Sequence, residues 1–254
     1  MRKAFCFKTA LFVILICLIS VTFCGCVNTQ NWVNEISETA IKNNVTIHVK
    51  SYNTNLLNEE YESQTYFGSG VIYYQYLNTY YCLTNNHVVY KPNQYKKRSI
   101  TVNDCYGNEY SAAVVVSDPK FDLAVVSFYS ADKVFVPQPL AMQNPKASEN
   151  VAALGQPMGQ INSLTLGKIF IMQTVTLAQN NKYASDVDFK VIYHNAPINT
   201  GSSGGALINN NLEIVGINFA ILFDETDNSF RFGCAIPIEK VREFLENNHL
   251  LFNN

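Results

Sequence analysis

The sequence contains few charged residues and no long run of basic residues. Charged side chains make up 15% of the 254 residues. The basic cluster at Lys96, Lys97 and Arg98 is short, and a cluster of this size is more typical of a solvated loop than of a polyanion-binding surface. The sequence therefore argues against a nucleic-acid partner.

Cysteine is also scarce once the first 26 residues are set aside. The remaining cysteines are Cys82, Cys105 and Cys234, too few and too scattered for a disulfide framework or a metal cage. Cys82 lies in an apolar run and is interpreted as a small core residue, although a bridge between Cys82 and Cys105 stays open. We expect no metal and no organic cofactor, so stability has to come from a hydrophobic core.

Tyrosine and phenylalanine are plentiful, by contrast, and indicate packed strands. Aromatic residues make up 13% of the sequence, which favours β-structure over a disordered or coiled-coil chain. A chain of this length can bury one large core or two small ones. The predicted strands cover about 45–49, 65–76, 79–84, 99–104, 109–116 and 122–128, with a polar loop at 53–63. Apolar residues at helical spacing predict short helices at 32–41 and 237–249, the latter starting with Pro237.

The stretch with the strongest chemical meaning is Gly-Ser-Ser-Gly-Gly at residues 201–205. Its glycines allow a tight backbone turn that exposes the Ser203 hydroxyl and leaves nearby amides free to converge on an oxyanion. Such a string by itself is more often an ordinary turn between strands. Its interpretation therefore depends on residues upstream.

Two upstream segments supply the partners that a nucleophilic serine requires. His87 ends an apolar strand, and Asp122 stands at the start of a buried one. A serine hydroxyl needs an adjacent base, and the imidazole needs a carboxylate that fixes its tautomer and stabilises its charged form. Histidine, aspartate and serine follow one another here in the chain order of chymotrypsin-like enzymes.

From about residue 33 to 249, the chain resembles an HtrA/Deg-type serine protease domain of the chymotrypsin fold. The matching motifs are residues 68–72, 83–88, 121–126, 155–159, 196–207 and 214–218. The resemblance implies an all-β fold of two six-stranded antiparallel β-barrels, with a short N-terminal and a C-terminal helix. Within a protease domain at 27–249, it places barrel one at about 44–130, barrel two at about 147–236 and the C-terminal helix at 237–249.

The resemblance also assigns roles to individual residues. His87 becomes the general base, Asp122 its orienting carboxylate and Ser203 the nucleophile, while the amides of Gly201 and Ser203 form the oxyanion hole. The sequence departs from the family at Ser202, usually asparagine, and at Asn195, usually aspartate; both are peripheral to the proton path. Only a short helical tail follows the second barrel, so we expect no peptide-binding PDZ module.

Two other residues compete for the triad roles. His194 lies nine residues before Ser203, but a double barrel needs a histidine from the first lobe to meet a serine from the second, which favours His87. Asp118 precedes a proline, and an Asp-Pro pair is a turn opener whose carboxylate bonds the local backbone. Asp122 is therefore preferred.

The expected substrate pocket carries no charge. Pro197, six residues before the nucleophile, is expected to line its base, where a carboxylate would select lysine or arginine. Asn218 stands where the related glutamyl endopeptidases place a histidine, so an acidic preference is not supported. The predicted pocket residues are Pro197, Thr200, Asn218, Phe219 and Ala220. Small or medium apolar side chains are the remaining expectation.

The first 26 residues are read as a leader for export. Arg2, Lys3 and Lys8 precede an uncharged apolar stretch at 10–23, which is the layout of a signal segment. Cys26 follows a glycine and resembles a lipidated cysteine of bacterial lipoproteins; an uncleaved anchor and a simple cleaved leader stay open. Because residues 1–25 hold three basic and no acidic side chains, their removal shifts the net charge from −2 to −5.

Together these observations predict an exported, membrane-tethered serine endopeptidase that cleaves unfolded or misfolded proteins on the outer face of the cytoplasmic membrane. The resemblance also implies a homo-trimer assembled through residues 32–44. Two alternatives stay open: a secreted chymotrypsin-fold protease of narrow specificity, and a non-catalytic double-barrel module that binds peptides.

Overall fold

The computed structural model describes residues 29–156, 163–174, 185–224, 226–227 and 229–252. The chain divides into two compact units, 1–39 and 40–254. In the first unit, residues 29–38 form a helix, so the helix predicted at 32–41 is present but starts and ends earlier. No helix in the described ranges is both long and apolar enough to span a membrane. The predicted leader, including Cys26, lies outside the described residues.

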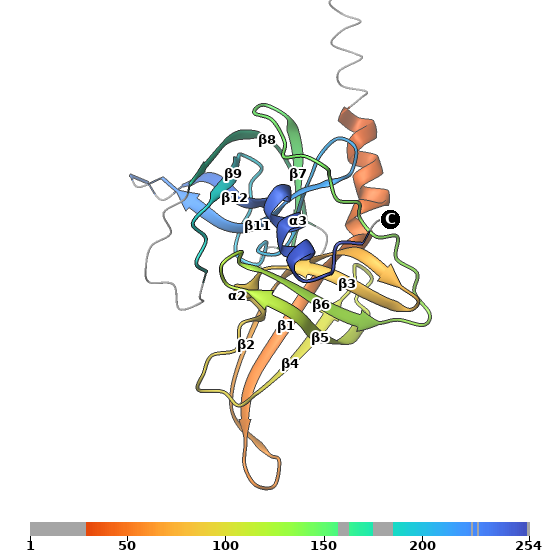
Figure 1. Cartoon of the computed structure of the whole chain (residues 1–254), viewed down its shortest axis with the longest axis vertical. Coiled ribbons are helices and arrows are strands. Elements are labelled where there is room, and N and C mark those ends of the chain that lie inside the picture. Colours follow the sequence, from red (N-terminus) through yellow and green to blue (C-terminus); the bar gives the residue numbers. More distant parts are fainter. Residues whose placement is uncertain (1–28, 157–162, 175–184, 225, 228, 253–254) are drawn as a thin grey trace, which may run out of the picture. The chain divides into compact units, whose positions relative to one another are not determined.

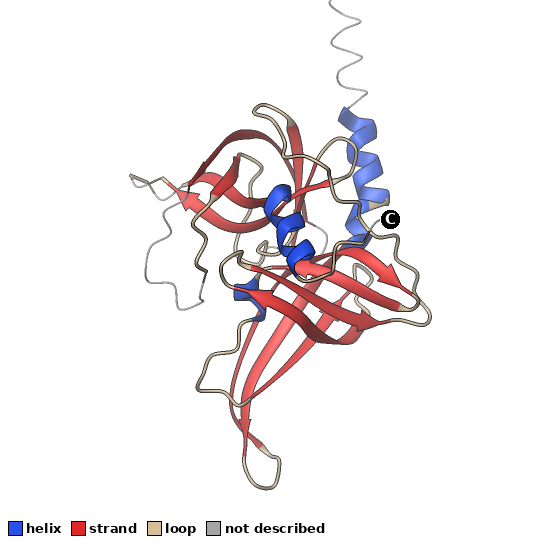
Figure 2. Cartoon of the chain, viewed as in Figure 1, coloured by secondary structure: helices blue, strands red, loops and turns tan. Residues whose placement is uncertain are grey.

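The second unit consists mainly of two closed antiparallel β-barrels (Figures 1 and 2). Barrel one contains β1 (Asn44–Thr54), β2 (Glu60–Tyr76), β3 (Thr79–Thr84), β4 (Lys97–Asn103), β5 (Glu109–Asp118) and β6 (Leu123–Tyr129). Barrel two contains β7 (Asn150–Gly155), β8 (Ser163–Thr174), β9 (Lys190–His194), β10 (Ala206–Ile208), β11 (Ile214–Phe223) and β12 (Phe230–Pro237). The two predicted six-stranded barrels are confirmed, and the short elements η1 (Ala40–Asn43) and α2 (Asn86–Val89) accompany barrel one.

The strand order explains how each barrel closes. Barrel one follows the order β1-β2-β3-β6-β5-β4, and β4 pairs back with β1. Barrel two follows β10-β11-β12-β9-β8-β7, and β7 pairs with β10. Closure leaves neither sheet with a free edge and turns alternate side chains of each strand toward a core.

Alternating apolar residues fill the core of barrel one. On β1, Val45, Ile47 and Val49 are fully buried, as expected for a strand with one face inward. Tyr80 packs edge-on against Phe135, with 5.0 Å between ring centroids. Buried aromatic contacts of this kind contribute beyond the area that they remove from water.

All three described cysteines are free thiols, so the bridge between Cys82 and Cys105 is not formed. Cys82 is fully buried in the core of barrel one, which confirms its interpretation as a small core residue. Burial raises the pKa of the Cys82 thiol, and it raises that of Cys234 to about 12. Neither thiol is therefore a reactive thiolate at neutral pH.

The first hairpin is longer than predicted. β1 and β2 pair as far as Thr54 and Glu60, so the polar loop expected at 53–63 shrinks to residues 55–59. Asn53 Nδ2 donates a hydrogen bond to Glu62 Oε2 (3.0 Å) across the two strands. The prediction failed because backbone pairing extends strands whose side chains are polar on both faces and carry no hydrophobic period.

The C-terminal helix α3 (Ile238–Asn247) packs on β11 and β12 of barrel two. Its buried residues are Ile238, Val241, Phe244 and Leu245, the stripe predicted from the sequence. Pro237 precedes the helix as its N-cap residue instead of occupying the first helical position. Beyond the helix, Phe252 stacks on Tyr74 of barrel one at a centroid distance of 3.7 Å, so the C-terminal segment contacts both barrels.

Candidate active site

Strand pairing brings His87 and Asp122 together. β3 pairs with β6, with Thr84 opposite Ala124, so the residues just beyond these strand ends are neighbours. Asp122 Oδ2 lies 2.8 Å from His87 Nδ1, and the backbone N–H of His87 donates to Asp122 Oδ1 at 2.9 Å. Both carboxylate oxygens are therefore engaged by the same residue. The Asp122 side chain is 1% exposed and the His87 side chain 22%, so the imidazole alone reaches solvent.

Local backbone interactions fix the position of Asp122. Its φ of +50° lies in the left-handed region, which aspartate and asparagine tolerate better than most residues. The Asp122 amide donates to the Pro119 carbonyl (3.2 Å), and Asn85 Nδ2 donates to the Asp122 carbonyl (2.9 Å). Asp118, the rival carboxylate, accepts the Lys120 amide at 2.8 Å and opens this turn, as expected of an Asp-Pro pair.

Ser203 follows a tight turn whose geometry depends on glycine. The Ser202 amide donates to the Asn199 carbonyl at 2.9 Å, and Gly201 has a φ of +97°. A hydrogen bond from the amide of the fourth residue of a turn to the carbonyl of the first, with a positive φ at the third residue, is characteristic of a type II turn. The amides of Gly201 and Ser203 have no acceptor within the described part of the chain. Two donors close together thus stay available beside the serine hydroxyl.

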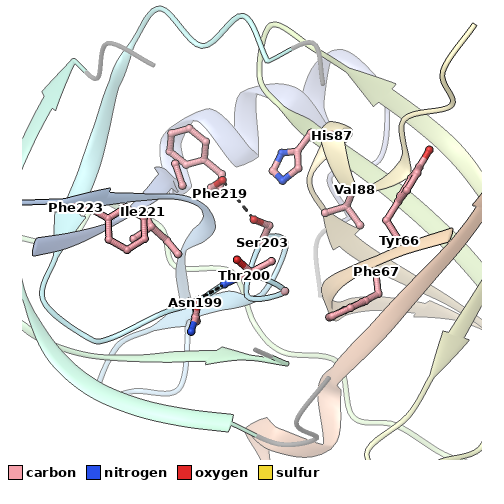
Figure 3. A pocket seen from close by; sticks show the side chains of 12 residues that line it. Tyr66, Phe67, His87, Val88, Asn199, Thr200, Ser203, Phe219, Ile221 and Phe223 are labelled. Carbon is pink, nitrogen blue, oxygen red and sulfur yellow. Dashed lines mark hydrogen bonds between the residues drawn. The ribbon is translucent and has the colours of Figure 1, made fainter. Parts of the chain in front are cut away.

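The Ser203 hydroxyl and His87 lie in the same pocket without a hydrogen bond between them. Ser203 Oγ donates instead to the Phe219 carbonyl at 3.4 Å, while His87 projects into the pocket from α2 (Figure 3). A contact of this length is weak, and in ligand-free structures the bond between nucleophile and base often forms only with substrate.

The pocket has a volume of about 420 Å³ and lies between the two barrels. Figure 3 shows Phe219, Ile221 and Phe223 on one side of Ser203, and Tyr66 and Phe67 on the other. Within the described ranges, no aspartate, glutamate, lysine or arginine lines it. The complete lining is Tyr66, Phe67, His87, Val88, Asn199, Thr200, Gly201, Ser203, Phe219, Ala220, Ile221 and Phe223.

Three of the five predicted pocket residues, Thr200, Phe219 and Ala220, belong to this lining. Pro197 lies outside it: the residue is exposed, and its carbonyl accepts the Thr165 hydroxyl at 2.7 Å. Asn218 is also outside it and fully buried. The pairing of β11 with β12 is irregular between Asn218 and Ala220. Asn218 points to the interior on one side of this bulge, whereas Phe219 and the residues after it line the pocket.

Sequence reasoning missed the wall formed by Tyr66, Phe67 and Val88. Tyr66 Oη donates to the Tyr90 carbonyl at 2.8 Å, which fixes the ring beside the pocket. The available signal was an aromatic pair directly before the glycine-rich 68–72 motif. Asn199 and Phe223 were missed as well.

His194, the rival histidine, lies inside barrel two on β9 and does not line the pocket. Its Nε2 is 3.0 Å from Asn218 Oδ1, and the residue is fully buried. Burial lowers the pKa of His194 to about 4, although the Asn218 hydrogen bond and the Ala196 backbone act in the opposite direction. The imidazole is therefore neutral at pH 7.

Two closed six-stranded barrels with a histidine, a carboxylate and a serine between them define the class of chymotrypsin-like double barrels. Residues 68–217 match the family described as trypsin-like peptidase domain. The match covers more than half of the chain, and the protein belongs to this family.

Curated relatives are proteases of the HtrA type. The chain is 30% identical to "Serine protease HtrA-like" of Staphylococcus epidermidis (strain RP62A), over 87% of this chain and 37% of the relative. It is 34% identical to the "Periplasmic pH-dependent serine endoprotease DegQ" of Escherichia coli (strain K12), over 69% of this chain and 35% of the relative. The chain thus spans little more than a third of the length of these relatives.

A solved structure of an HtrA-type protease has a similar fold. It is a serine-to-alanine variant of AlgW with a tripeptide, with a TM-score of 0.62 and 27% identity. The match covers 85% of this chain and 62% of that chain.

Proposed function

We propose that the protein is an exported serine endopeptidase of the HtrA/Deg type that cleaves unfolded or misfolded proteins. The observation that carries this proposal is the His87–Asp122 pair, with its Nδ1–Oδ2 distance of 2.8 Å, whose imidazole lines the same pocket as Ser203. The type II turn at 199–202 supports it, because it leaves the Gly201 and Ser203 amides available beside the hydroxyl.

Acylation uses these groups in sequence. Ser203 Oγ attacks the carbonyl carbon of the scissile peptide, and His87 Nε2 accepts the hydroxyl proton. Asp122 stabilises the imidazolium through Nδ1–H, while the amides of Gly201 and Ser203 donate to the oxyanion. Collapse of the tetrahedral intermediate breaks the C–N bond, and the leaving amine takes the proton from His87.

Deacylation repeats the same steps with water as the nucleophile. His87 removes a proton from the water, whose oxygen attacks the acyl carbon, and the proton is returned to Ser203 Oγ as the ester bond breaks. The oxyanion is again held by the two amides. The reaction consumes one water per peptide bond, and none of its steps draws on an electron donor.

Export and membrane association belong to this proposal through the sequence alone. The basic and apolar leader and Cys26 support export followed by lipidation at the outer face of the cytoplasmic membrane. The relative DegQ is named a periplasmic protein. A homo-trimer formed through residues 32–44 rests on family resemblance.

A fluorophosphonate tests the chemistry directly. Incubation of the native protein should yield one phosphonylated residue, Ser203, mapped by mass spectrometry, and His87→Ala should abolish the adduct. An unlabelled native protein would instead favour the non-catalytic peptide-binding module. Digestion of an unfolded protein alongside its folded form distinguishes the two protease hypotheses. Rapid cleavage of the unfolded chain at many sites supports the HtrA type, and a single cut supports a protease of narrow specificity.

The pocket wall at Phe67 should contact the side chain of the substrate residue that follows the scissile bond. Because the leaving amine receives its proton from His87, that part of the substrate lies toward Val88 and Phe67. Phe67→Ala should lower kcat/KM about tenfold for peptides with a leucine at this position, as expected when about 1.4 kcal/mol of apolar contact is lost. Measurement of kcat/KM on matched leucine and glycine peptides checks this.

The glycine peptide should be cleaved equally by both proteins. Tyr76→Ala removes another exposed aromatic ring from the same strand, 62% exposed and outside the pocket, and should leave both rates unchanged. Equal losses on leucine and glycine peptides in Phe67→Ala would contradict the assignment of this wall.

A further inference from the structure

Ser69 extends from barrel one into the turn that precedes the nucleophile. It lies on β2 between two glycines and is fully buried. Its hydroxyl donates to the Gly201 carbonyl at 2.7 Å and accepts the Gln156 amide at 2.9 Å. A single oxygen atom thus joins β2, the turn at 199–202 and the end of β7.

The backbone of Ser69 reinforces the same contact. Its amide donates to the Ser203 carbonyl at 2.7 Å, and its carbonyl accepts the Thr84 hydroxyl at 2.7 Å. Gly204 packs so closely that a Cβ built on it would lie 2.1 Å from the Ser69 backbone carbonyl oxygen, and the φ of Gly204 is +88°. The carbonyls on both sides of Ser202 are therefore held by one residue of the opposite barrel.

These contacts fix the peptide unit between Gly201 and Ser202 at both ends. Its carbonyl oxygen is bound by the Ser69 hydroxyl, and its N–H donates to the Asn199 carbonyl at 2.9 Å. The Gly201 amide belongs to the preceding peptide unit, but its place beside the pocket depends on where Gly201 itself lies, and the bond to the Gly201 carbonyl fixes that position. Movement of that carbonyl would cost a buried hydrogen bond and leave an unpaired acceptor, about 1–3 kcal/mol.

We propose that Ser69 is a positioning residue for the oxyanion hole: its hydroxyl holds the turn of barrel two at the position from which the Gly201 amide can reach the oxyanion. The catalytic consequence rests on the proposed function, whereas the restraint on the turn does not. Ser69 does not line the pocket, so it acts through Gly201 without touching substrate.

Ser69→Ala tests this role, with Ser130→Ala as a matched control. The Ser130 hydroxyl is also buried in barrel one, donates to a backbone carbonyl and accepts a backbone amide, both of Lys133. Ser130 lies beyond the end of β6 opposite to Asp122. Any general cost of losing such a hydroxyl should appear in both variants.

In Ser69→Ala, kcat for a peptide substrate should fall about 10- to 100-fold, with KM within about twofold. Affinity for a peptidyl boronate, whose tetrahedral adduct on Ser203 uses the oxyanion hole, should fall by a similar factor. Ser130→Ala should leave kcat and the boronate affinity close to those of the unmodified protein. Equal kcat losses in the two variants would overturn the inference.

Amide hydrogen exchange tests the restraint even if the protein proves not to be a protease. The Ser202 N–H should exchange about tenfold faster in Ser69→Ala than in the native protein, while amides of β9 keep their protection. Unchanged protection of Ser202 in Ser69→Ala would overturn the inference whatever the activity. Absence of hydrolysis by the native protein would refute the proposed function and leave this measurement to decide the role of Ser69.

Discussion

Replacement of Asp122 by asparagine should lower kcat for peptide hydrolysis by about 10⁴-fold while the protein stays folded. The reason lies in the two hydrogen bonds to His87. The backbone N–H of His87 requires an acceptor at the Oδ1 position, 2.9 Å away, so the asparagine oxygen must occupy that place. Its NH₂ group then faces Nδ1, which favours the tautomer with the proton on Nε2. This imidazole cannot accept the proton of Ser203.

The backbone at position 122 should accommodate asparagine without strain. Asparagine tolerates the φ of +50° as well as aspartate does, and Asn85 binds the backbone carbonyl, which the substitution leaves unchanged. The measurements are kcat on a peptide substrate, the midpoint of thermal unfolding, and the ¹⁵N shifts of the His87 ring, which report its tautomer.

Asp118→Asn is the control for Asp122→Asn. Asp118 has the same side chain in the same turn, and its carboxylate accepts the local amide of Lys120, so kcat should stay within about twofold. If Asp122→Asn retained a tenth or more of the native rate, the proposed role of Asp122 would be wrong.

The second large effect concerns stability at acidic pH. Burial lowers the pKa of His194 to about 4 in the folded protein, against 6.5 as the ordinary value. The unfolded chain therefore binds more protons between these values, and the free energy of unfolding falls as the pH drops from 6.5 to 4. One pKa unit corresponds to about 1.36 kcal/mol, so His194 alone should account for about 3 kcal/mol. Above pH 6.5 its contribution is constant.

This loss of stability at acidic pH should affect the backbone next to the turn that carries Ser203. Asn218, the hydrogen-bond partner of His194, exchanges backbone bonds with the two glycines after Ser203: its amide donates to the Gly205 carbonyl (2.9 Å), and its carbonyl accepts the Gly204 amide (2.8 Å). Solvation of a charged His194 would require β9, which carries His194, to move away from β11, which carries Asn218. Acid should therefore weaken the support of Ser203 before it affects barrel one.

Urea unfolding at pH 7.5, 5.5 and 4.5 checks the size and sign of this effect. His194→Gln keeps a side-chain N–H that can reach Asn218, but glutamine cannot take up a proton. Over this pH range, the free energy of unfolding of the variant should therefore fall by about 3 kcal/mol less than that of the native protein. Tyr193→Phe, a neighbouring change on the same strand that leaves His194 in place, should show the native pH dependence. Parallel pH profiles for the native protein and His194→Gln would contradict the prediction.

Several features of the fold could be predicted because their signals are local. Alternating apolar residues predicted most strands of barrel one, and the stripe at 238, 241, 244 and 245 predicted α3. The hairpin at 44–76 was underestimated because its polar outer half is held by backbone pairing, which leaves no periodic pattern in the side chains. Pro197 was placed in the pocket from its distance along the chain, whereas the bulge on β11 and the turn at 199–202 decide which residues face it.

The sequence by itself determined the groups available for chemistry: a histidine and an aspartate at the ends of apolar strands, and a serine in a glycine-rich turn. Only the tertiary structure decided how they are held. The hydrogen bonds of Ser69 to Gly201, of Asp122 to His87 and of His194 to Asn218 join residues 132, 35 and 24 positions apart. The physical reason is that barrel closure and the seam between barrels set these distances, and such non-local geometry leaves no periodic signal in the chain.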